Sequence, residues 1–318
     1  PGESTYTRYD TDVTQRTIEW LEAHKNDPTP WCLFVGLVAP HFPLVVPQDY
    51  LEHYPIDALP PRKLHPRDGY VRHPWVQREH DFFPSEDQFH DEDERLMAIA
   101  CYLGLVSWMD DNVGKIVNAL AATQLDADTR IIYTSDHGDN VGHRGLWGKS
   151  NFYLESVAVP LIMAGPEIPT AVSDTPVSLI DLYPTILQSF GLDSPNDQAP
   201  RPGRSLVDIA SEPVDDERVV FSQYHAVGCE SAGFMVRRGR WKYHHYEGYP
   251  AELFDLYEDP EEMRDLANDP AHAKTVTEMH RLLKSICDPK ATDRAAKARQ
   301  AELIDRKSTR LNSSHLVI

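Results

Sequence analysis

The residue types best suited to chemistry lie in one short stretch, residues 133–139 (YTSDHGD). Asp136 and His137 follow an apolar run, residues 130–133, that is typical of a β-strand. At the carboxyl end of a strand, where open α/β sheets build their sites, a carboxylate and an imidazole offer oxygen and nitrogen ligands to a metal ion. Twelve residues after His137, Lys149 in the sequence GLWGK adds the positive charge that an anionic ester needs. The stretch therefore predicts a metal and oxyanion site.

Composition and charge limit the classes of protein. The chain has 318 residues, 41% of them apolar, which allows two domains and a core, and its formal net charge is −19. The acidic excess predicts no nucleic-acid surface, because phosphate binding needs a dominant basic face. No apolar stretch approaches membrane-spanning length, so we expect no membrane partner. A local cationic pocket still permits a small anionic substrate.

Two helices are predicted to support the site. Asp10 or Thr11 is suited to cap a helix that ends before Pro28. Apolar residues at spacings of three and four predict a long amphipathic helix over residues 93–122. We expect this second helix to cover one face of a sheet.

Three apolar segments are predicted as strands, at residues 31–39, 130–134 and 157–164. The first is apolar almost throughout, as parallel strands covered on both faces are. The alternation of strands and helices predicts an α/β domain over residues 1–216, with a mainly parallel sheet sandwiched by helices.

After the Pro-rich and acidic linker at residues 195–216, short strand signals and a helical end replace the earlier pattern. They predict a small α+β domain over residues 217–304, with antiparallel hairpins and a terminal helix. The predicted strands cover residues 218–224, 233–237 and 241–246.

Both ends of the chain depart from those of an ordinary domain. Residues 305–318 (DRKSTRLNSSHLVI) resemble the translation of a common sequencing adapter, so we expect them to lie outside the fold. The chain opens at Pro1, without a methionine. Together the two ends indicate a fragment of a longer protein.

Several short sequence motifs in this chain resemble those of the sulfatase family of the alkaline phosphatase superfamily, and their order and spacing match as well. Any one of them is weak evidence, whereas the ordered set is strong. The resemblance extends from about Tyr9 to Asp269. The motifs that carry it are APHFP (39–43), TSDHGD (134–139), GLWGK (145–149), ESVAVPLI (155–162), DLYPT (181–185), GRWKY (239–243) and LFDL (253–256).

The resemblance implies that Asp136 and His137 are two ligands of one divalent ion. Family members often carry Asp-Asn here and bind Ca²⁺, whereas the Asp-His form recurs among choline-sulfatase-like and phosphonate-hydrolase-like relatives. We expect Ca²⁺, with Mn²⁺ as the alternative because an imidazole is softer than calcium prefers. The structural alternatives are a strand-end cap for Asp136 and a hydrogen-bonded loop histidine for His137.

The same resemblance implies catalytic roles for Lys149 and His41. Lys149 matches the lysine that touches the sulfate or the bridging oxygen, and His41 matches the histidine that holds the sulfate or serves the leaving oxygen. The alternatives are a solvated lysine and a structural histidine. Further candidates for substrate contact are His143, Arg144 and His225.

Sulfatases attack sulfur with a hydrated formylglycine, made from Cys or Ser in a C/S-x-P-x-R motif, and use two further Asp ligands near the amino terminus. Neither element is present in this sequence. We therefore expect the nucleophile upstream of Pro1, in a parent that hydrolyses a sulfate monoester to alcohol and inorganic sulfate. The alternatives are a phosphonate monoester hydrolase or phosphodiesterase of the same superfamily, and an inactive anion- or glycan-binding protein.

Overall fold

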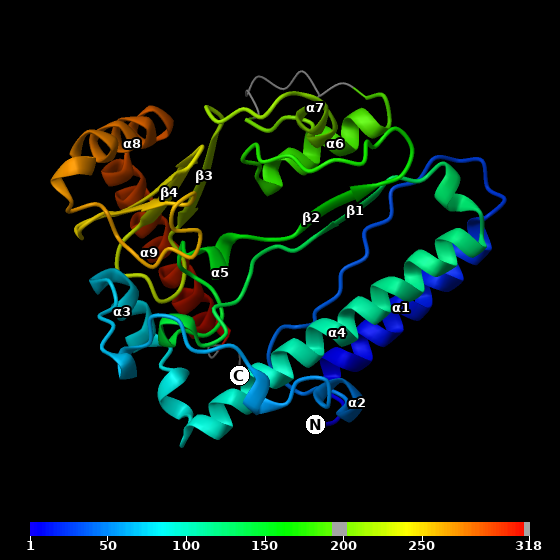
Figure 1. Cartoon of the computed structure of the whole chain (residues 1–318), viewed down its shortest axis with the longest axis horizontal. Helices are drawn as coiled ribbons and strands as arrows, with labels where there is room; N and C mark the ends of the chain where they lie inside the picture. Colours follow the sequence, from blue (N-terminus) through cyan, green and yellow to red (C-terminus); the bar gives the residue numbers. More distant parts are fainter. Residues whose placement is uncertain (193–201, 315–318) are drawn as a thin grey trace.

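The computed structural model describes residues 1–192 and 202–314, with side chains to residue 305 (Figure 1). The helices are α1 (Thr5–His24), α2 (Gln48–Leu51), α3 (Pro74–Phe82), α4 (Glu92–Ala122), α5 (Leu154–Val157), α6 (Leu182–Ser189), α7 (Leu206–Ser211), α8 (Ala273–Ile286) and α9 (Pro289–Ser314). The strands are β1 (Ile131–Thr134), β2 (Leu161–Ala164), β3 (Val219–Tyr224), β4 (Gly233–Arg238), β5 (Trp241–Tyr246) and β6 (Glu252–Asp255).

Helix α1 begins earlier than predicted, because Ser4 rather than Asp10 caps it. The Ser4 hydroxyl accepts a hydrogen bond from the Thr7 N–H at 3.1 Å. Asp10 is fully buried inside the helix, and its two oxygens accept the N–H groups of Val38 and Ala39, both at 2.8 Å. Asp10 therefore anchors the chain just before His41.

Helix α4 confirms the long helix predicted for residues 93–122. Asp91 caps it by accepting the Glu94 N–H at 2.8 Å, and acidic residues in its first turn suit the helix dipole. Figure 1 shows α1 lying alongside α4. The Tyr133 hydroxyl, on β1, lies 3.7 Å from the Met109 sulfur, so α4 packs against this strand.

The prediction of a mainly parallel sheet is wrong for the described residues. β1 pairs with β2 in antiparallel register, Ile131 opposite Ala164 and Thr134 opposite Leu161. Two parallel strands need a crossover connection, usually a helix, that returns the chain to the end of the sheet where the first strand began. Here the intervening residues form a long loop and α5, which has only four residues, so the chain turns back. Helices do flank the pair on both sides, α4 on one and α6 on the other (Figure 1).

The strand predicted at residues 31–39 is also not formed. The segment is extended, but no described strand pairs with it. Its last two N–H groups bind the Asp10 carboxylate instead, and Phe34 is 92% exposed. An apolar sequence supplies a strand's side chains, whereas a ladder partner must come from elsewhere in the fold.

The carboxy-terminal part contains the short strands that the sequence predicts. They form a four-stranded antiparallel sheet in the order β3-β4-β5-β6. Alternation along β4 sends its residues to two faces: Phe234 and Val236 pack against Met279 and Leu283 of α8, while Met235 faces a second core. That second core includes Trp75, Phe152, Tyr153, Tyr246 and Phe254. The sheet therefore packs directly against the chain that follows Lys149.

Helix α9 continues through residues 305–314 of the segment that resembles an adapter translation, and residues 315–318 of that segment lie outside the described part. Among the described residues, no helix is long and apolar enough to cross a membrane.

Candidate functional site

The loop between β1 and α5 carries five of the predicted site residues: Asp136, His137, His143, Arg144 and Lys149. Within it, one oxygen of Asp139 accepts the N–H groups of Val141 and Gly148, each at 2.9 Å. The Asn140 N–H also donates to the Gly148 carbonyl at 2.7 Å. These bonds draw the far end of the loop back to its start. Lys149, next to Gly148, therefore leaves the same closed loop that presents Asp136 and His137.

The polar side-chain atoms of Asp136 and His137 lie close together. The His137 Nδ1 hydrogen bonds to the Gly138 carbonyl at 2.8 Å, which requires the ring proton at Nδ1 and leaves the lone pair on Nε2. This Nε2 lies 3.5 Å from Oδ2 of Asp136, whose side chain is 82% exposed. The other Asp136 oxygen accepts the His137 N–H at 2.9 Å, so the strand-end cap is formed as well. Oδ2 and Nε2 are thus both available to one cation.

The donor chemistry of this pair fits a divalent ion, although two ligands cannot complete its coordination. Calcium takes roughly six to eight oxygen ligands, and an imidazole suits manganese better. Within residues 1–192 and 202–314, no group of three or more His, Cys, Asp or Glu side chains is placed to hold a metal. Further ligands must therefore come from outside this set.

His41 and Lys149 are in direct contact, although 108 residues separate them. The Lys149 Nζ lies 3.2 Å from His41 Nε2. An ammonium has no acceptor, so Nζ donates and Nε2 accepts. The other ring nitrogen of His41 bonds to the Phe42 carbonyl at 2.8 Å, which places the ring proton there. The two side chains to which the family resemblance gives catalytic roles are thus in contact.

Gly138 fixes how the loop sits on α5. Its N–H donates to the Ser156 carbonyl at 2.8 Å, and a Cβ at this position would collide with the Glu155 carbonyl oxygen. The loop therefore packs directly against the backbone of α5 at Gly138. Sequence patterns gave no indication of this contact, because glycine's lack of a side chain is informative only once its neighbour is known.

The geometry does not support Arg144 as a substrate ligand. Its side chain is 1% exposed, and its guanidinium donates to Glu155 at 2.8 Å and to the Glu262 carbonyl at 2.9 Å. It also lies 3.9 Å from the centre of the Tyr153 ring. Every one of these partners is protein, so Arg144 is committed to internal contacts.

No hydrogen bond or ring contact joins His143 or His225 to His41 or Lys149 among the described residues. Burial lowers the pKa of His143, and its Nδ1 has no hydrogen-bond partner among the described residues. His225 directs Nε2 to the Gln223 side chain at 3.2 Å, packs against the Phe234 ring, and has its pKa lowered by burial. Their substrate-binding role stays a prediction without geometric support.

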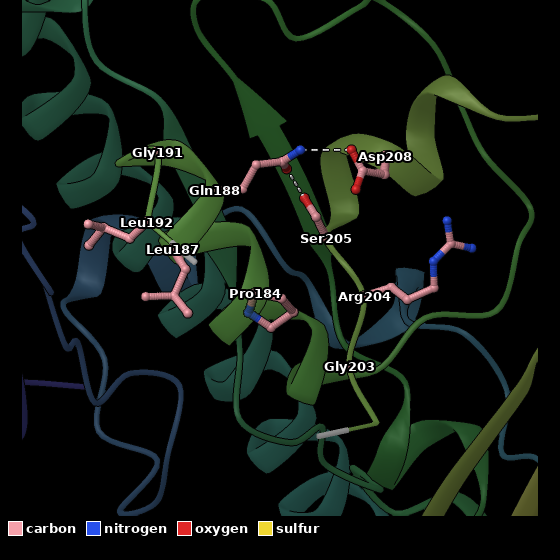
Figure 2. A pocket seen from close by; sticks show the side chains of 9 residues that line it. All are labelled: Pro184, Leu187, Gln188, Gly191, Leu192, Gly203, Arg204, Ser205 and Asp208. Carbon is pink, nitrogen blue, oxygen red and sulfur yellow. Dashed lines mark hydrogen bonds between the residues drawn. The ribbon is translucent and has the colours of Figure 1, made fainter. Parts of the chain in front are cut away.

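A cavity of about 500 Å³ lies elsewhere, between α6 and α7 (Figure 2). Gln188 and Asp208 hydrogen bond across one end of it at 2.7 Å. None of the predicted site residues lines it. It has no connection to the chemistry of the loop.

Comparison with known proteins identifies the family of this chain. The model of the sulfatase family matches residues 1–192. The chain belongs to the sulfatase family. A second model, the carboxy-terminal part of N-sulphoglucosamine sulphohydrolase, matches residues 142–288. The sulfatase match includes the whole β1–α5 loop together with His41.

Individual relatives cover most of this sulfatase chain. A choline-sulfatase of Rhizobium meliloti is 30% identical over 309 residues, covering 92% of this chain and 59% of its own length. A multifunctional alkaline phosphatase superfamily protein of Trinickia caryophylli is 31% identical, covering 84% and 57%. The structure of a phosphonate monoester hydrolase from Silicibacter pomeroyi superposes with a TM-score of 0.73 at 28% identity, covering 87% and 59%. The chain thus spans less than two thirds of each of these proteins.

Proposed function

We propose that the protein to which this chain belongs hydrolyses a sulfate monoester to an alcohol and inorganic sulfate. The observation that carries the proposal is the 3.2 Å contact between Lys149 Nζ and His41 Nε2 beside the loop that exposes Asp136 and His137. Membership of the sulfatase family supports it. The relative named as a choline-sulfatase makes choline sulfate one candidate substrate.

Asp136 Oδ2 and His137 Nε2 would hold a divalent ion, Ca²⁺ or Mn²⁺. When bound, such an ion offsets the charge of the sulfate oxygens and polarises sulfur. The residues of this chain set the protonation and exposure of the two metal donors. The Gly138 carbonyl holds the His137 ring proton on Nδ1, and the exposed Asp136 carboxylate needs little desolvation to bind a cation.

Lys149 and His41 would act on the oxygens of the ester. The Lys149 ammonium has three protons, of which one is directed at His41, so two remain for a sulfate or bridging oxygen. His41 is oriented by Phe42 and can take or give a proton only at Nε2. A lysine that hydrogen bonds to this atom helps to place a proton near the departing oxygen.

The nucleophile in this proposal is a formylglycine supplied by sequence outside these 318 residues. The chain contains no C/S-x-P-x-R word, and it spans 59% of the choline-sulfatase relative. Without the nucleophile, covalent turnover is lost while some affinity for the anion is retained. We therefore expect the 318-residue chain alone to be inactive.

A phosphonate monoester hydrolase is the second candidate, favoured by the 0.73 TM-score to an enzyme of that name. The third is a protein that binds anions or glycans without turnover, in which a missing nucleophile needs no further explanation. Both retain the same metal donors, so only catalysis separates them from a sulfatase.

Parallel assays decide among the three. The chain alone and the chain joined to its own upstream coding sequence are assayed with 4-nitrophenyl sulfate and 4-nitrophenyl phenylphosphonate. We expect hydrolysis only by the extended protein, with kcat/KM at least about tenfold higher for the sulfate. A preference for the phosphonate by the same factor replaces the proposal with the second candidate. Sulfate binding without turnover by the extended protein replaces it with the third.

A further inference from the structure

A buried ion pair in the carboxy-terminal sheet lies directly behind the loop. The Lys242 Nζ, on β5, is 2.6 Å from one carboxylate oxygen of Glu262, and the two side chains are 1% and 0% exposed. A buried pair of this kind gains little stability over apolar residues of similar size. Its presence therefore raises the question of what else the carboxylate does.

Glu262 makes two contacts with the site-bearing part of the chain. Its second carboxylate oxygen accepts the N–H of Leu154, the first residue of α5, at 2.6 Å. Its backbone carbonyl accepts the Arg144 guanidinium at 2.9 Å. One residue, 108 positions after Leu154, thus holds both α5 and the turn that carries Arg144.

These contacts continue to the predicted metal donors. Arg144 pairs with Glu155 at 2.8 Å, and Lys63 pairs with the same carboxylate. The Ser156 carbonyl in turn receives the Gly138 N–H at 2.8 Å, immediately after His137. Two hydrogen-bonded contacts, joined by the backbone of α5, therefore connect the carboxy-terminal sheet with the loop: Glu262 to Leu154, and Ser156 to Gly138.

We infer that Glu262 is a positioning residue for the metal donors, and that the carboxy-terminal sheet is part of the apparatus that holds the Asp136–His137 loop in place. The inference rests on the proposed function for its catalytic meaning, because only a metal site gives the loop's position a chemical consequence. Its structural content, that α5 and the loop loosen together when Glu262 is changed, does not depend on that function.

Amide hydrogen exchange of the 318-residue chain, followed by mass spectrometry, tests this coupling. Glu262→Gln weakens the acceptor for Leu154 and leaves Lys242 without a charged partner. We expect exchange in residues 135–142 to rise about tenfold, the equivalent of one lost hydrogen bond, with little change in α4. Glu261→Gln is the matched control, since its side chain is exposed, and should match the parent chain.

A second variant separates positioning from the cost of an unpaired charge. Lys242→Met/Glu262→Met replaces the ion pair with apolar side chains, which buried sites tolerate. We expect it to melt near the temperature of the parent chain and still to show the faster exchange at residues 135–142. If Glu262→Gln does not fold, this double variant decides. Unchanged protection of the loop, or an equal loss of protection throughout the chain, overturns the inference.

Metal binding distinguishes failure of the inference from failure of the proposed function. Mn²⁺ titration of the extended protein, with and without the Glu262 changes, should show about tenfold weaker binding by the variants, a scale seen for residues that orient metal ligands. If the extended parent protein binds no Mn²⁺ while the variants still loosen the loop, the metal is removed from the proposed function and the positioning role stays intact. If the parent and the variants bind Mn²⁺ equally tightly and hydrogen exchange in the loop is unchanged, the positioning role is refuted and the metal stays in the proposed function.

Discussion

Replacing Lys149 with methionine is expected to lower kcat/KM for 4-nitrophenyl sulfate by about 10³-fold in the extended protein. The reason is electrostatic, because one preorganised donor aimed at a developing oxyanion contributes roughly 3 to 4 kcal/mol of transition-state stabilisation. Methionine fills similar space but offers neither charge nor proton. The contact with His41 Nε2 is lost in the same step, so that ring also loses its donor.

The control for this change is Lys290→Met on α9, where the lysine is exposed. That variant should retain the activity of the parent, and both variants should unfold at nearly the same urea concentration, because Lys149 is not buried. A loss below about tenfold for Lys149→Met, with folding intact, would remove this lysine from the chemistry.

Glu79 is expected to make the chain lose stability as pH rises from 5 to 8. It lies on α3, is 7% exposed, and one of its oxygens has no hydrogen-bond partner among the described residues. Burial raises the pKa of this carboxyl to about 8. Its pKa when unfolded is near 4.5, so above that pH the unfolded chain releases a proton that the folded chain keeps. The contribution of Glu79 to the free energy of unfolding is therefore fully present below about pH 4.5 and is lost progressively as the pH rises toward 8.

The predicted loss is roughly 3 to 4 kcal/mol between pH 5 and pH 8. Glu79→Gln has no titrating group, so the free energy of unfolding of this variant should fall by that much less over the same interval. Urea unfolding at the two pH values, with the exposed Glu19→Gln as control, measures the difference. Equal pH dependence in Glu79→Gln and the parent chain would show that the carboxyl is not held neutral.

Short-range patterns predicted those parts of the fold that depend on the chain's own periodicity. The helix predicted at residues 93–122 follows from its apolar spacing, and the strands β3 to β5 appear within one residue of their predicted bounds. Strand direction was not predictable in this way. The same apolar segment at residues 161–164 suits a parallel or an antiparallel partner, and the loop before it decides which.

The same distinction applies to the site: the sequence indicates its reactive residues, but not the tertiary contacts that support them. The resemblance to a family implies a role for His41 and for Lys149, whereas their contact, across 108 residues, does not follow from their spacing. The supporting contacts were missed because they depend on tertiary neighbours. The position of Asp10 predicts a helix cap, yet its carboxylate binds the chain before His41, and no pattern around Glu262 predicts that it reaches α5. The place of Arg144 in the loop predicts a substrate ligand, whereas the structure buries its side chain.

The central claim is that Asp136, His137, His41 and Lys149 form one site for a cation and a sulfate group. A crystal structure of the extended protein grown with Mn²⁺ and sulfate, with the metal located by its anomalous signal, tests this directly. The account predicts Mn²⁺ bound to His137 Nε2 and the Asp136 carboxylate, with a sulfate oxygen on Lys149 Nζ. Metal and sulfate at separate places, away from these four side chains, would contradict it.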